Sequence, residues 1–104
     1  AWGTPLIVDS EFDDSEWPTL ATVNGRPAIS YAVASGDTSI LRYVQAADPD
    51  GNIWHSPMTV QLPGSGQGGA TYMSLAEVNG RPAISYYFQD PATGTFQLRY
   101  AVYY

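Results

Sequence analysis

The side chains of this sequence that could do acid–base or ligand chemistry fall into three groups, of which the first is acidic. Five carboxylates gather within residues 9–17, at Asp9, Glu11, Asp13, Asp14 and Glu16. Carboxylates repeated around an assembly would attract a cation or a basic partner, with Phe12 and Trp17 as contacts. A solvated loop explains the same charges, and the corresponding stretch 63–69 of the second half has none. The sequence therefore favours a solubilising loop over a binding site.

The second group consists of four arginines, which are all the Lys and Arg residues of the chain. They form two pairs at matching positions of a repeat, Arg26 with Arg81 and Arg42 with Arg99. Guanidinium groups set in this way could bind a carboxylate. A structural role, in which each guanidinium bridges neighbouring sheets or caps a turn, explains better why every arginine recurs.

The third group is His55 and the turn that precedes it. A single histidine with no cysteine gives no zinc-ligand set within one chain. Residues 48–52 read Asp-Pro-Asp-Gly-Asn, which lacks the further acidic ligands of a calcium loop and fits a hairpin turn. No nucleophile elbow, phosphate-binding loop or pair of catalytic carboxylates is present. We therefore expect no enzyme activity, no cofactor and no metal site.

A long repeat dominates the chain. The segment 20–31, Leu-Ala-Thr-Val-Asn-Gly-Arg-Pro-Ala-Ile-Ser-Tyr, returns at 75–86 with one difference, Thr22 against Glu77. An offset of this size, about 55 residues, is typical of solenoids, propellers and arrays. Asn-Gly at 24–25 and at 79–80 is a strong hairpin pattern, because both central residues of a type I′ turn need positive φ. The sequence thus predicts two copies of one hairpin-based unit.

The predicted elements are short strands separated by turns. We expect strands at 20–23, 26–34, 40–46, 54–60, 71–78, 81–89 and 96–103, with loops at 9–17, 35–39 and 63–69. The segment 2–8 matches 54–60 with Trp, Pro and Val at equal spacing, which indicates an outermost strand. Apolar side chains fall on both faces of 40–44 and 84–88, so both faces need cover. No helical period is present, and the fold class is therefore all-β, with four-stranded antiparallel sheets.

These motifs carry a resemblance. Trp-x-x-Pro-x-x-Val, then the repeated segment, then Leu-Arg-Tyr at 41–43 and 98–100, resembles the blades of bacterial β-propellers with highly similar repeats, which are loosely grouped with the sialidase-type (BNR-like) repeats. The resemblance covers nearly the whole chain and implies a propeller fold without implying an activity. It implies one propeller segment over 1–104: an outer strand at 1–8, a first blade at 19–62, and three strands of a second blade at 71–104.

The phase of the repeat predicts self-assembly. Outer strands D alternate with inner strands A, B and C in the order D-ABC-D-ABC, so the second blade lacks an outer strand. Two blades do not close a ring, and fewer than three stacked repeats are seldom stable. We expect copies to join head to tail by strand exchange, a Velcro closure, with three chains giving six blades or four giving eight. The residues expected at this interface are Trp2, Pro5, Ile7, Val8, Leu98, Tyr100 and Val102. A chain cut in this phase is expected to be an excised or engineered piece of a longer propeller.

The alternative function is a glycan-binding module. In this topology the loops 9–17, 35–39, 63–71 and 90–95 share one face of the propeller, where aromatic and carboxylate groups could hold a sugar. The candidate ligand contacts are Asp13, Asp14, Trp17, Asp37 and Tyr72. The tyrosines also suit packing between blades, which is the simpler interpretation.

Composition restricts the partners further. The formal net charge is −6 and lysine is absent, which argues against nucleic acid, since phosphate contacts need a basic surface. No apolar run approaches the ~18 residues that a membrane span needs. The absence of cysteine leaves the redox compartment open. No compartment follows from the sequence, although a natural chain of this type is expected to be extracellular or periplasmic.

Overall fold

The computed structural model of the protein describes residues 1–11, 15–35, 38–61, 68–90 and 92–104. All regular structure in these ranges is β, which confirms that the fold is all-β. The strands are β1 (Ser15–Val23), β2 (Arg26–Ser35), β3 (Thr38–Gln45), β4 (Met58–Gln61), β5 (Gly68–Val78), β6 (Arg81–Gln89) and β7 (Phe96–Val102). Within the described ranges no helix of a length and hydropathy that could cross a membrane occurs.

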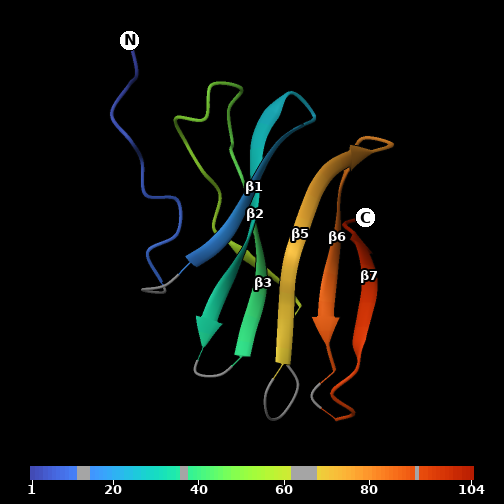
Figure 1. The fold of residues 1–104 in the computed structure, drawn as a ribbon. Helices are drawn as coiled ribbons and strands as arrows, with labels where there is room; N and C mark the ends of the chain where they lie inside the picture. Colours follow the sequence, from blue (N-terminus) through green and yellow to red (C-terminus); the bar gives the residue numbers. More distant parts are fainter. Residues whose placement is uncertain (12–14, 36–37, 62–67, 91) are drawn as a thin grey trace.

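The strands form two antiparallel units. The first unit has the order β1-β2-β3-β4 and the second has the order β5-β6-β7. A short parallel pairing of Thr38 and Ser39 with Gly68 and Gly69 links the two. In Figure 1 the units stand side by side, with the N-terminal segment along the outside of the first unit and β7 at the far edge of the second. The two ends of the chain therefore lie on opposite flanks and do not pair with each other.

Tight hairpins build each unit, as the sequence predicts. Asn24 and Gly25 have φ of 51° and 74°, and Asn79 and Gly80 have φ of 51° and 76°. These left-handed conformations at both central positions are what a type I′ turn requires, and Asn and Gly adopt them at low cost. Both turns lie at the same end of the two units (Figure 1).

The main core lies between the two units. Ala28, Ala32 and Leu41 of the first unit pack with Ile84 and Phe88 of the second, all of them buried. The small side chains at 28 and 32 leave room for the larger ones that face them across the core. A second cluster of Tyr31, Val33 and Val44 covers the opposite face of the first unit, with Val8, Ile29 and Trp54 packed against it. Both faces of the first unit are therefore covered, as expected from its apolar pattern.

The innermost strands are longer than predicted, so the predicted loops at 9–17 and 63–69 are wrong at their ends. Residues Ser15–Trp17 belong to β1 and Gly68–Gly69 belong to β5. Trp17 and Tyr72 both have φ of 51°, and the pairing register shifts at each of them. Such a bulge lets a strand continue past an unpaired residue, which alternation alone does not reveal.

The outer strands are shorter than predicted. Within 54–60 the ladder begins only at Met58, although Trp54 makes an isolated bridge to Ala46. The segment 2–8 forms no strand within this chain. The turn expected at 35–39 is also shorter, since Ser35 and Thr38 pair with each other.

Candidate functional site

The outer face of the second unit exposes side chains whose equivalents in the first unit are buried. Leu98 and Tyr100 are 81% and 62% exposed, whereas Leu41 and Tyr43, at the same repeat positions, are 0% and 4% exposed. Tyr87 and Phe96, which meet edge to face at 5.8 Å, extend this exposed aromatic surface. Contiguous apolar surface of this kind marks an interaction site more often than an isolated exposed residue does.

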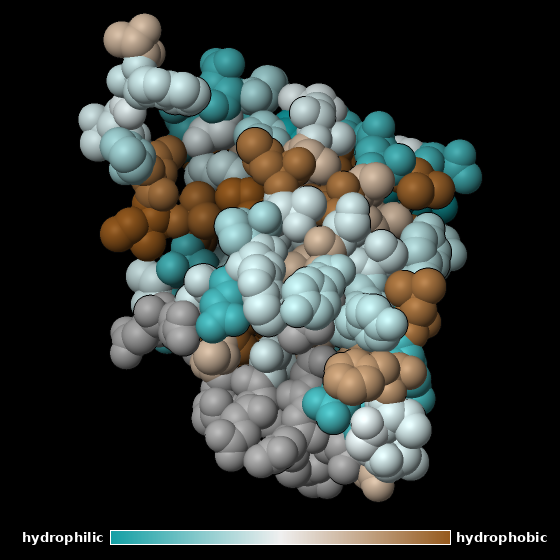
Figure 2. Space-filling view, in the orientation of Figure 1, coloured by the Kyte–Doolittle hydropathy of each residue, from teal (hydrophilic) through white to brown (hydrophobic). Residues whose placement is uncertain are grey.

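The outer face of the first unit is the counterpart of that surface. Leu20 is 70% exposed, whereas its repeat equivalent Leu75 is 6% exposed and packs in the main core. Figure 2 shows hydrophobic side chains along the flank that carries the N-terminal segment and in a band across the molecule. The second unit thus exposes the face whose equivalent the first unit buries, whereas the outer face of the first unit is exposed at Leu20 and covered around Tyr31 and Val33.

Asp9 joins the N-terminal segment to the first unit through a hydrogen bond and an ion pair. The Tyr31 hydroxyl donates to Asp9 Oδ2 at 2.5 Å, and Arg42 Nε lies 3.6 Å from the same oxygen. Glu11 Oε2 accepts a further bond from Arg42 Nη1 at 2.9 Å. Burial, and then the hydrogen bond to Asp9, raise the pKa of Tyr31, so its hydroxyl remains a donor at neutral pH.

The same arrangement recurs in the second unit around Gln61. The Tyr86 hydroxyl donates to Gln61 Oε1 at 2.8 Å, and Arg99 Nη1 donates to the same oxygen at 2.9 Å. Tyr86 and Arg99 are the repeat equivalents of Tyr31 and Arg42. The oxygen of residue 9 therefore occupies in one unit the position that the oxygen of residue 61 occupies in the other.

By this equivalence, the N-terminal segment corresponds to the outer strand of a unit other than the one that it contacts. Gln61 comes from β4, which pairs with β3 of the first unit while its side chain reaches across to the second. Asp9 follows the matching segment 2–8, which has no such sheet behind it. Within the described ranges the outer edge of β7 is also unpaired. Within the described ranges, β7 thus has an unpaired outer edge, and the segment 2–8 has no strand with which it pairs.

The hairpin turns form the seam between the two units. The backbone N–H of Asn24 donates to Glu77 Oε1 at 2.6 Å, and Asn24 Nδ2 donates to the carbonyl of Gly80 at 2.7 Å. Further along β1, Thr19 Oγ1 donates to the carbonyl of Met73 at 3.1 Å. The one difference between the repeated segments, Thr22 against Glu77, therefore falls on a contact of this seam.

The structure brings two of the predicted ligand contacts together. The rings of Trp17 and Tyr72 stack with centroids 5.1 Å apart and planes 23° apart, and both remain exposed. Asp13, Asp14 and Asp37 lie outside the described residues. Asp9 stood out in the sequence only as one of five carboxylates and Gln61 not at all, although aligning 2–8 with 54–60 places the two at the same position.

The predicted interface residues lie on the two flanks. Trp2 and Ile7 are exposed on the N-terminal segment, and Val8 packs against the second cluster. Pro5 is exposed on the same segment, and Val102 is half-buried at the end of β7. Leu98 and Tyr100 are exposed on β7 itself, as described above, so these two sets do not meet within one chain.

Asp48 and Arg99 have structural partners. Asp48 Oδ1 accepts from the N–H groups of Asn52 and Ile53 at 2.9 and 3.2 Å, so this aspartate closes its own turn. The guanidinium of Arg99 lies 4.0 Å from the ring centre of Phe88. Over the described part of the chain, no group of three or more His, Asp and Glu side chains could hold a metal ion.

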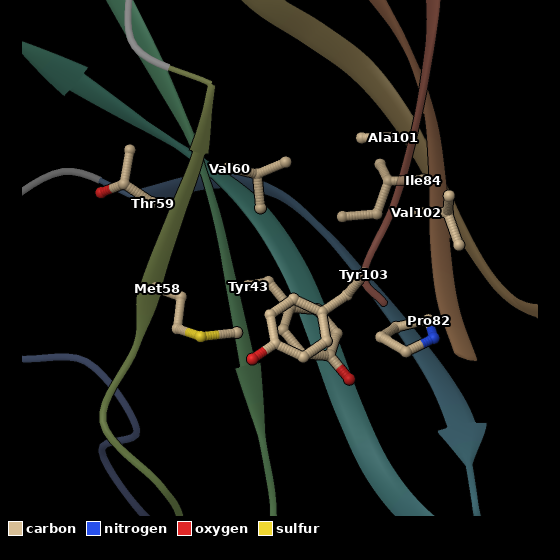
Figure 3. A pocket seen from close by; sticks show the side chains of 9 residues that line it. All are labelled: Tyr43, Met58, Thr59, Val60, Pro82, Ile84, Ala101, Val102 and Tyr103. Carbon is tan, nitrogen blue, oxygen red and sulfur yellow. The ribbon is translucent and has the colours of Figure 1, made fainter. Parts of the chain in front are cut away.

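A groove opens between the units at the edge where β4 faces β6 and β7. One part has a volume of about 280 Å³, and an adjoining part of about 330 Å³ also has Asn24, His55 and Arg81 in its lining. Figure 3 shows side chains of β4 on one wall, side chains of β6 and β7 on the other, and the rings of Tyr43 and Tyr103 between them.

Comparisons of the chain with protein-family models, with curated proteins and with solved structures find no match.

Proposed function

We propose that the chain is a non-enzymatic structural unit that assembles head to tail with copies of itself into a closed β-propeller. The observation that carries the proposal is the equivalence of Asp9 and Gln61. Gln61 reaches its Tyr–Arg pair from the outer strand of the neighbouring unit. Asp9 makes the same contacts from a segment with no unit behind it. A second copy supplies that unit.

The register of the exchange follows from the repeat. In the first unit β3 pairs with β4 as Leu41↔Gln61, Arg42↔Thr59 and Tyr43↔Met58. The equivalent partners at the seam between copies are Leu98 with Asp9, Arg99 with Ile7 and Tyr100 with Leu6 of the next copy. This pairing gives the second unit a fourth strand. It also covers the outer edge of β7, which would otherwise favour aggregation.

The same docking buries both exposed faces. Leu98 and Tyr100 of one copy meet the face of the next copy that carries Leu20, as Leu41 and Tyr43 meet the second unit inside the chain. The two faces belong to different surfaces of the molecule, so the interface is heterologous and forms a ring when the rotation closes. Three copies give six blades and four give eight.

Native mass spectrometry tests this proposal. We expect one discrete assembly of three or four chains, and a folded 11.3 kDa monomer over the whole concentration range contradicts it. Ile7→Asp places a charge in the exchanged strand and is expected to dissociate the assembly. Ile53→Asp, at another exposed isoleucine outside the exchanged strand, is the matched control and is expected to leave the subunit count unchanged.

A second candidate function is carbohydrate binding by the assembled protein. Trp17 and Tyr72 favour it, because they are exposed, stacked and both held at positive φ. Bulky residues adopt that conformation at a cost, and such strain gathers at functional sites. A glycan array probed with the oligomer tests this candidate. Loss of a bound glycan on Trp17→Ala, at unchanged subunit count, supports it, and an array without binding rejects it.

A further inference from the structure

The groove between the units has an apolar end and a second end, called the polar end below, whose lining also includes polar and charged side chains. Met58 and Val60 of β4 face Ile84 and Val102 across the apolar end (Figure 3). The adjoining part is lined by polar and aromatic groups, among them His55, Arg81 and Tyr104. Small-molecule sites have this composition, with apolar walls and a few polar groups that fix orientation, and volumes from about 300 Å³ upward.

The residues of the polar end depart from the repeat. His55, Tyr103 and Tyr104 correspond to Gly3, Ala46 and Ala47 in the other half of the chain. Structural positions recur here, since even the backbone bond from Ala46 N to the carbonyl of Pro27 has a counterpart from Tyr103 N to the carbonyl of Pro82. Three large side chains that replace small ones at a single groove point to a role beyond packing.

A buried donor at the groove points the same way. Tyr43 lines both parts of the groove, is 4% exposed, and its hydroxyl has no hydrogen-bond partner among the described residues. Buried polar groups without a partner are uncommon, and each one needs an explanation such as a ligand. Burial raises the pKa of Tyr43 to about 12, so the hydroxyl carries its proton at neutral pH. The group therefore needs an acceptor.

Arg81 is the charged side chain that lines the polar end. The Arg81 guanidinium lies 5.0 Å from the ring centre of Tyr104 and has no ion pair with a carboxylate of the described residues. Arg42, by contrast, is paired with both Asp9 and Glu11. A cation–π contact leaves the guanidinium edge available to an anion.

We infer that this groove binds a small aromatic carboxylate. Its flat apolar body lies between Met58 and Ile84, and its carboxylate accepts hydrogen bonds from Arg81 and Tyr43. Tyr103 is 60% exposed and lines the groove together with the buried Tyr43, so the ligand enters as the ring of Tyr103 turns outward. The groove is formed by one chain, so the inference does not depend on the assembly proposed above.

Fluorescence titration of the intact protein with 2-naphthoate tests the inference. We expect saturable binding, and binding at least about 10-fold weaker for 2-naphthylmethylammonium, which has the same ring and the opposite charge. Tyr43→Phe is expected to weaken naphthoate binding about 10-fold while the free energy of unfolding stays the same or rises, because the variant removes an unpaired buried hydroxyl. Weaker binding at unchanged or higher stability would show that the Tyr43 hydroxyl contacts the ligand and does not serve only to stabilise the fold.

Arg81→Gln is expected to weaken naphthoate binding about 10-fold as well. Arg26→Gln is its matched control, because Arg26 is the repeat equivalent of Arg81 and lies outside the groove. The inference is overturned by the absence of saturable binding, by equal affinity for the anion and the cation, by equal effects of the two arginine variants, or by unchanged binding to Tyr43→Phe. None of these results bears on the subunit count, which tests the assembly separately.

Discussion

Leu98→Ala distinguishes a docking surface from an ordinary exposed side chain. In the single chain Leu98 is 81% exposed, so its truncation should leave the free energy of unfolding within about 0.5 kcal/mol of the parent value. In the assembly it takes the environment that Leu41, which is 0% exposed, has inside the chain. The same substitution should therefore be costly only where copies meet.

The size of the effect follows from the buried counterpart. Truncating a fully buried leucine to alanine costs about 2–5 kcal/mol. A loss of about 3 kcal/mol at each seam between copies corresponds to a roughly 150-fold weaker association at that seam. Leu41→Ala is the matched variant, and it should lower the free energy of unfolding itself by about 2–5 kcal/mol.

Sedimentation velocity over a dilution series measures the association, and urea denaturation monitored by tryptophan fluorescence measures the folding. Leu98→Ala should shift the dissociation of the assembly to higher concentration without a lower stability of the single chain. If Leu98→Ala and Leu41→Ala destabilise the fold equally, or if Leu98→Ala leaves the association unchanged, the equivalence of the two faces is wrong.

Three further predictions concern the seam, the N-terminal segment and pH. Glu77→Thr removes the acceptor for the backbone N–H of Asn24 and should lower the free energy of unfolding, measured in urea, by about 0.5–1 kcal/mol. Thr22→Glu should instead strengthen the association of copies by a similar amount, measured by dilution. Equal effects of both variants on folding alone would be inconsistent with this assignment. Asp9→Asn should change the free energy of unfolding by less than about 1 kcal/mol, since the amide of Gln61 makes the same contacts in the second unit. Asp9→Ala deprives the Tyr31 hydroxyl of its acceptor and should cost about 1–3 kcal/mol in thermal unfolding. An equal loss for both variants would refute the comparison. Burial raises the pKa of Tyr43 from 10.0 to about 12, so the folded state holds this proton more tightly, and the associated stability is complete below about pH 10 and falls as pH rises through about 12. Urea titrations across that range should show a shallower fall for Tyr43→Phe, and an identical slope would exclude Tyr43 as a source.

The sequence predicted the local structure well where turn chemistry decides it. Asn-Gly at 24–25 and 79–80 set both hairpins, because few other residue pairs accept positive φ at two successive positions. The strand 81–89 was predicted at its observed bounds for the same reason. The extension of β1 back to Ser15 was missed, since nothing in the local pattern indicates that Trp17 adopts φ of 51° and carries the strand through a bulge.

The candidate sites depend on contacts that a strand pattern does not contain. The match of Asp9 with Gln61 was available from the alignment of 2–8 with 54–60, but its meaning required the Tyr31 and Tyr86 contacts. The groove is formed by β4, β6 and β7 together, and the missing partner of the Tyr43 hydroxyl is a property of the packed units. The pairing of 2–8 with a neighbouring β7 stays a prediction.

An engineered disulfide tests the exchange of strands most directly. The chain has no cysteine of its own, so Leu6→Cys with Tyr100→Cys introduces one defined pair. Directly opposed residues of antiparallel strands have Cα atoms about 4.5–5.5 Å apart, within the range that a disulfide bridges. Leu6→Cys with Phe96→Cys is the control, because Phe96 lies further along β7 and out of this register. Under oxidising conditions the first variant should give a ladder of covalently linked chains that ends at one closed ring, and the control should not. A first variant that remains single chains on a denaturing gel, in a solution where the protein is folded, would contradict strand exchange between copies.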